Sequence, residues 1–150
     1  MVQLTALHRE DQRGVRFVHP ENWHITLRFL GDVEPGHVMA VLDGTSFAPA
    51  VAHLGPAVDV IAERTLVVPV RGLDNLAAAV AERTHHLGEP PRKRFVGHLT
   101  IARVKSRMPM PRALGARVSA EFDVEEIALV RSRLDPQGSR YESVETWSVG

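Results

Sequence analysis

The sequence contains no cysteine, which excludes a disulfide framework and every metal site built on thiolates. It has no apolar run near the roughly 20 residues that a membrane-spanning helix needs, and its first residues lack the apolar core of a signal peptide. Lys+Arg and Asp+Glu are 18 each, so no overall field attracts a polyanion and any bound phosphate must meet local positive charge. We therefore expect a cytoplasmic protein without membrane contact.

The 150 residues suffice for a hydrophobic core, and we expect residues 1–150 to form a single domain. Helical spacing of apolar residues predicts two main helices and a short third one, at residues 35–42, 74–87 and within 112–120. Apolar or alternating segments predict strands at residues 14–18, 23–30, 47–54, 65–70 and 95–104, and a hairpin of 122–134 with 140–148. This mixture predicts an α+β fold with largely antiparallel sheets.

A four-residue pattern of histidine, aliphatic residue, threonine and aliphatic residue occurs twice, about half a chain apart. The two copies are His24-Ile25-Thr26-Leu27 and His98-Leu99-Thr100-Ile101. Because side chains alternate along a strand, each histidine shares a face with its threonine, and the aliphatic pair faces the core. We expect the duplication to bring two similar strands side by side about a pseudo-twofold axis.

This pattern suits the opening of a cyclic phosphodiester, which needs a base to activate water and an acid to protonate the leaving sugar oxygen. Histidine can serve as either near neutral pH, so His24 and His98 are the predicted catalytic pair. The hydroxyls of Thr26 and Thr100 would donate to the non-bridging phosphate oxygens. The scheme requires no metal, and no third ligand is arranged for zinc. The alternative is that both histidines are ordinary polar residues on a solvated face.

Three segments resemble the two-histidine phosphoesterases, and within them the RNA 2′,3′-cyclic phosphodiesterases once studied as 2′-5′ RNA ligases. They are residues 20–31 (PENWHITLRFLG), 98–103 (HLTIAR) and 129–142, and the resemblance runs from about Gly14 to the end. It implies a bilobal, pseudo-twofold fold with the motifs facing each other across a central cleft. It also implies hydrolysis of RNA or nucleotide 2′,3′-cyclic phosphate ends to 2′-phosphates, without metal or other cofactor.

The resemblance further implies that Arg103, at the family's basic position after the second motif, contacts the phosphate. Simple alternation puts Arg103 on the face of Leu99 and Ile101, away from His98. The strand must therefore end, twist or bulge near Ala102 for Arg103 to reach the site. The alternative is a surface arginine. By alternation Arg28 shares the face of His24, which makes it another candidate to meet a phosphate.

The sequence departs from the family at its beginning. Family members usually start with a further strand and a long helix, whereas only 13 residues precede Gly14 here. We expect that strand and most of that helix to be absent, unless the start codon was assigned too late. Their loss would expose backbone groups and apolar surface.

The interpretation that follows is a metal-independent phosphodiesterase with His24 as the acid and His98 as the base, although the pseudo-symmetry allows the reverse assignment. Three alternatives remain open. The same site could join RNA ends through a 2′-5′ bond or open another small cyclic phosphate. It could bind RNA ends without turnover, or the domain could be purely structural.

Overall fold

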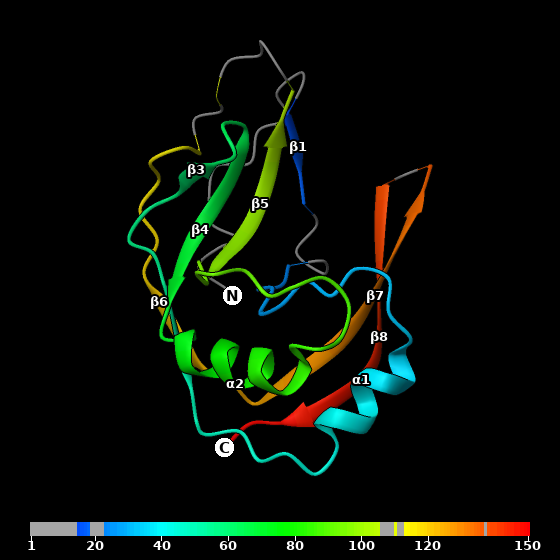
Figure 1. Ribbon diagram of the computed structural model, residues 1–150. Helices are drawn as coiled ribbons and strands as arrows, with labels where there is room; N and C mark the ends of the chain where they lie inside the picture. Colours follow the sequence, from blue (N-terminus) through cyan, green and yellow to red (C-terminus); the bar gives the residue numbers. More distant parts are fainter. Residues whose placement is uncertain (1–14, 19–22, 106–109, 111–112, 137) are drawn as a thin grey trace. The chain divides into compact units, whose positions relative to one another are not determined.

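The computed structural model describes residues 15–18, 23–105, 110, 113–136 and 138–150, and its contacts divide the chain into two compact units (Figure 1). We call them the sheet unit and the helix–hairpin unit. The sheet unit consists of the described residues within Met1–Thr26, Ala52–Arg71 and Val96–Phe122. The helix–hairpin unit consists of Leu27–Val51, Gly72–Phe95 and the described residues within Asp123–Gly150.

The sheet unit is built on a six-stranded sheet in which the strand order is β1-β5-β4-β2-β6, with β3 pairing β4. Its strands are β1 (Val15–Phe17), β2 (Val51–Leu54), β3 (Asp59–Ile61), β4 (Thr65–Arg71), β5 (His98–Val104) and β6 (Ala120–Asp123). The pairs β1–β5, β5–β4, β4–β2 and β4–β3 are all antiparallel. The two long strands β4 and β5 thus lie side by side in the sheet, as Figure 1 shows.

One face of this sheet forms a core. Val68 pairs directly with Leu99, and Leu66 pairs with Ala102, so these four side chains lie on the same face. Their exposed fractions are 0% or 1%. Burying aliphatic and β-branched side chains on one face stabilises the sheet by about 25 cal/mol for each Å² removed from water. It also leaves the opposite face of β5 for polar residues.

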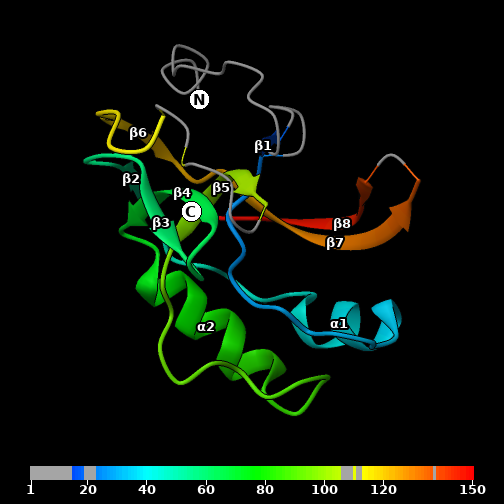
Figure 2. The same cartoon turned by 90° about the horizontal axis from the view of Figure 1, so that it is seen from above.

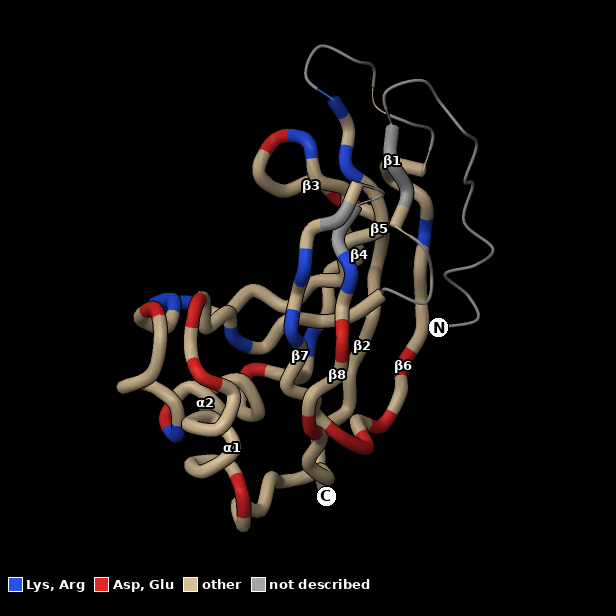
Figure 3. The backbone as a smooth tube through the Cα atoms, turned by 90° about the vertical axis from the view of Figure 1, so that its right-hand side faces the viewer, with Lys and Arg blue, Asp and Glu red and all other residues tan. Residues whose placement is uncertain are grey.

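The helix–hairpin unit contains two helices and a two-stranded antiparallel hairpin (Figure 2). Its elements are α1 (Pro35–Leu42), α2 (Asp74–Thr84), β7 (Glu126–Asp135) and β8 (Gly138–Ser148). Pro35 occupies the first turn of α1, where its missing N–H costs nothing. The indole Nε1 of Trp147 on β8 donates to the Asp43 carboxylate after α1 at 2.9 Å. In Figure 3 the basic residues of the hairpin lie toward its turn and the acidic residues toward its other end.

The end of α2 is held by a distant arginine. The Arg28 guanidinium donates to the Thr84 hydroxyl at 2.7 Å and to the carbonyls of Thr84, Leu87 and Glu89 at 3.0, 2.7 and 3.0 Å. These acceptors include carbonyls that a helix leaves unpaired at its C-terminus, where positive charge is favourable. Arg28 therefore caps α2 and is not a phosphate ligand in this arrangement.

The predicted α+β fold with antiparallel sheets is confirmed, and helix 35–42 is confirmed residue for residue. Helix α2 ends three residues earlier than predicted, at Thr84. The strand predicted at 23–30 is wrong, since within that range only Ile25 makes a β-bridge. The short helix is also wrong for the described residues 113–120, which hold a turn and a bridge at Arg117.

The segment predicted as one strand at 122–134 belongs to two sheets, because β6 ends at Asp123 and β7 begins at Glu126. Strand β3 was not predicted. The expectations about the segment before Gly14 fall outside the described residues. Within the described part of the chain, no helix is both long and apolar enough to cross a membrane.

Candidate active site

The structure brings the two histidine–threonine motifs together within the sheet unit. Ile25 and Leu99 form an antiparallel β-bridge. In that register His24 lies opposite Thr100, and Thr26 lies opposite His98. Diagonal neighbours across antiparallel strands have Cβ atoms about 7 Å apart, so the two histidines lie within reach of one phosphate group.

Both motifs present their polar residues on the same face. The bridge places Ile25 on the face of Leu99, which is 1% exposed. His24 and Thr26 therefore lie on the opposite face together with His98 and Thr100. There His24 and Thr26 are exposed, and His98 and Thr100 are half-buried. The adjacency predicted from the internal repeat is confirmed, but only the second copy lies in a long strand, β5.

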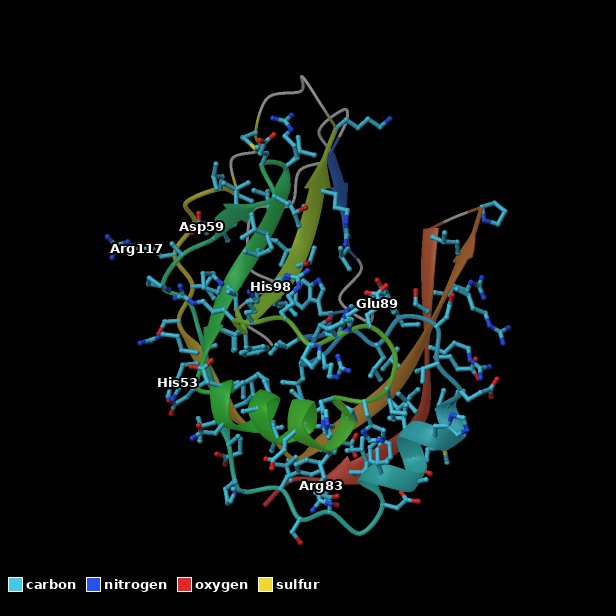
Figure 4. The ribbon with its side chains drawn as sticks, viewed as in Figure 1. His53, Asp59, Arg83, Glu89, His98 and Arg117 are labelled. Atoms are coloured by element: carbon cyan, nitrogen blue, oxygen red, sulfur yellow. The ribbon has the colours of Figure 1, made fainter. Side chains whose placement is uncertain are left out.

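The ring of His98 is fixed by its own neighbouring backbone. Nδ1 lies 2.8 Å from the carbonyl oxygen of Val96 (Figure 4 labels His98). Because a carbonyl oxygen only accepts, Nδ1 carries the hydrogen of this bond. Nε2 of a neutral His98 then holds the lone pair, which is the form a general base requires.

The segment before His24 is tied to β5 through backbone and indole contacts. Trp23 Nε1 donates to the Val18 carbonyl at 3.1 Å, and the Val18 N–H donates to the Ile101 carbonyl at 2.8 Å. These two bonds link the residue next to His24 to the strand that carries His98. The relative position of the histidines thus depends on several contacts and not on the single bridge.

Arg103 reaches the polar face through a β-bulge. Val67 pairs with Thr100 while the preceding residue Leu66 pairs with Ala102, so Ile101 is the extra residue on β5. Ile101 and Ala102 are both buried, at 4% and 0% exposed, and Arg103 after them is exposed. The alternation is thereby shifted by one residue, which moves Arg103 to the face of the histidines. The bulge is the feature that the sequence argument required near Ala102.

Sequence reasoning did not single out Arg71, although the structure puts it on this face. Pro69 pairs directly with His98, and Arg71 lies two residues further along β4 on the same side. Alternation along the strand from Thr65 predicts that Arg71 and Pro69 share a face. The pairing of Pro69 with His98, however, cannot be predicted from the sequence of either strand. Among the described residues, no three His, Asp or Glu side chains gather in a way that could hold a metal ion.

The chain is similar to known proteins in both sequence and structure. The family described as LigT like Phosphoesterase matches residues 2–54. An RNA 2′,3′-cyclic phosphodiesterase from Aquifex aeolicus (strain VF5) is 33% identical over 154 residues, covering 90% of this chain and 82% of that protein. A crystal structure of a Thermus thermophilus protein has a TM-score of 0.76 at 29% identity and covers 91% of this chain and 82% of its own.

A crystal structure of E. coli LigT complexed with 3′-AMP has a TM-score of 0.72 over the same shares of the two chains. Its identity of 23% supports a shared fold alone. The Aquifex relative supports more than the fold, because its 33% identity extends over nearly the whole of this chain and most of its own length. The chain belongs to the two-histidine phosphoesterases, in the LigT-like family of RNA 2′,3′-cyclic phosphodiesterases.

Proposed function

We propose that this chain hydrolyses 2′,3′-cyclic phosphates at RNA ends or on nucleotides to 2′-phosphates. The observation that carries the proposal is the Ile25–Leu99 bridge, which puts two histidines and two threonines on one accessible face. The names of the relatives support a phosphoesterase and an RNA substrate.

In the proposed reaction His98 Nε2 takes a proton from water as the oxygen attacks phosphorus. The bond from phosphorus to the 3′-oxygen breaks, and a protonated His24 delivers its proton to that oxygen. The product is a 2′-phosphate with a free 3′-hydroxyl. His98 ends protonated and His24 neutral, and exchange with solvent restores both. The Thr26 and Thr100 hydroxyls and the Arg103 guanidinium stabilise the charge on the non-bridging oxygens.

The test is hydrolysis of 2′,3′-cyclic AMP, and of a short RNA with that end, in the presence of a chelator. We expect turnover that survives the chelator and gives the 2′-phosphate, identified by phosphorus NMR. A 3′-phosphate product or activity lost with the chelator would contradict the scheme. Binding without turnover would favour an RNA-end binding module, and a joined product would favour 2′-5′ ligation.

Replacing Arg103 tests the role of the bulge. Arg103→Gln should lower kcat/KM by roughly 10- to 100-fold, because one charged donor to the developing negative charge is lost. Arg103→Lys should recover part of this, since the charge remains but the two-pronged geometry does not. Arg83→Gln, which removes an exposed arginine in the last turn of α2, is the matched control. Equal rates for Arg103→Gln and the control would show that Arg103 is a surface arginine.

A further inference from the structure

A second basic feature of the sheet unit lies beside the end of β4. A hollow of about 370 Å³ is lined there by the Leu54–Pro56 segment and by Arg71, Arg117 and Ser119. We call it the arginine hollow. Its lining includes two arginines and a serine, residue types that commonly donate to phosphate.

The two arginines have no acidic partners within the described part of the chain. Both are exposed, and no described carboxylate lies within ion-pair distance of either one. The nearby acid on β6, Glu121, is paired with His53 at 3.2 Å. Figure 4 shows Arg117 extending outward from the segment that precedes β6. Two arginines that line one hollow and lack an acidic partner among the described residues favour an anionic ligand.

The hollow is fixed relative to the catalytic face. Gly55 N–H donates to the Pro69 carbonyl, and Val118 N–H donates to the Pro56 carbonyl, both at 2.9 Å. Gly55 has φ +122, and a Cβ there would collide with the Val118 carbonyl oxygen, so the two segments pack backbone against backbone. Pro69 in turn pairs with His98. The wall of the hollow and the proposed base therefore share one strand pair.

Arg71 connects the two sites. It follows Pro69 by two residues on the face of His98, which makes its Cβ a diagonal neighbour of His98 at about 7 Å. Thr100 and Arg103 lie on the other side of His98 along β5. A phosphate held by Thr100 and Arg103 would thus leave the adjoining part of an RNA chain room to pass His98 toward Arg71.

We propose that the arginine hollow binds the phosphodiester immediately upstream of the reacting end, so that the chain selects RNA ends over free cyclic nucleotides. This inference rests on the proposed function and specifies its substrate class. Arginine is suited to the contact because its planar fork binds phosphate oxygens in pairs. The Ser119 hydroxyl adds a further donor.

The experiment compares 2′,3′-cyclic AMP, which lacks the upstream phosphate, with the dinucleotide ApA ending in a 2′,3′-cyclic phosphate. The readout is the ratio of kcat/KM for the dinucleotide to that for the mononucleotide. Arg71→Gln and Arg117→Gln should each lower this ratio about tenfold, the effect of one charge-assisted phosphate contact. The control Arg83→Gln should leave the ratio as in the wild type.

Salt dependence gives a second readout. For the wild type, the slope of log kcat/KM against log salt should be steeper by about 0.7 for the dinucleotide, as expected for one more single-strand phosphate contact. The variant that combines Arg71→Gln with Arg117→Gln should lose this difference in slope. A ratio and slope unchanged in both arginine variants would overturn the assignment of the hollow.

The two proposals can fail separately. If the wild type hydrolyses neither substrate, the proposed function fails. Equilibrium binding of ApA carrying a terminal 2′-phosphate then decides on the hollow. An affinity about tenfold weaker in each arginine variant than in Arg83→Gln would support it, and equal affinities would refute it.

Discussion

His24→Ala and His98→Ala are each expected to lower kcat for 2′,3′-cyclic AMP hydrolysis by at least roughly 100-fold, the scale of lost general acid or base catalysis. The double variant should be little slower than either single variant, because the two histidines act as a unit on one phosphorus. Both effects are measured as initial rates of purified variants whose circular dichroism spectra match that of the wild type. His37→Ala, an exposed histidine on α1, is the matched control.

The pH profile of the same variants separates the two roles. A reaction that needs one protonated and one neutral histidine gives a bell-shaped profile in the wild type. With His24 as the acid, His24→Ala should lose the alkaline limb. With His98 as the base, held with its hydrogen on Nδ1 by Val96, His98→Ala should lose the acidic limb. Loss of the acidic limb in His24→Ala and of the alkaline limb in His98→Ala would reverse the assignment of acid and base. A rate near that of the wild type in either variant would refute the two-histidine mechanism.

The chemistry of this site is more visible in the sequence than its geometry. Alternation places each histidine with its threonine on one face, and the repeat indicates that the two copies belong together. The bridge between Ile25 and Leu99 is a long-range pairing, and no local pattern specifies it. Arg103 shows the same limit, since the position of its side chain depends on a bulge whose partner residues are on β4.

The strand prediction for residues 23–30 failed because the alternation of apolar and polar residues continues in the sequence after the chain has left the sheet. The chain passes from the sheet unit to the helix–hairpin unit after Thr26. Phe29 is 66% exposed, so no buried sheet face accounts for its place in the pattern. Strand β3 was missed because it has three residues and starts with an aspartate, a residue depleted in strands. Both errors arise because pairing with distant segments, and not the local sequence pattern, decides where a strand forms.

Alternation along the strand put Arg28 on the face of His24, but in the structure its side chain binds the end of α2. Replacing Arg28 is expected to have the largest effect on stability. Arg28→Met should lower the free energy of unfolding by about 2–4 kcal/mol, because several carbonyls at the end of α2 lose a charged donor. Burial lowers the pKa of Arg28, since desolvation disfavours its charged form. The hydrogen bonds offset that cost in the folded chain. Urea unfolding followed by circular dichroism measures the change.

A double-mutant cycle with Thr84 separates capping from a general effect of charge. Thr84 is 1% exposed, and its hydroxyl accepts from Arg28 Nε while donating to the Val80 carbonyl, both at 2.7 Å. Thr84→Val keeps the shape and removes the acceptor, so Arg28→Met and Thr84→Val should couple by about 1 kcal/mol. Arg28→Lys should fall between wild type and Arg28→Met, because a single ammonium cannot reach every acceptor. Additive effects in the cycle, or a loss in Arg83→Gln as large as in Arg28→Met, would show that α2 needs only positive charge near its end and not this arginine.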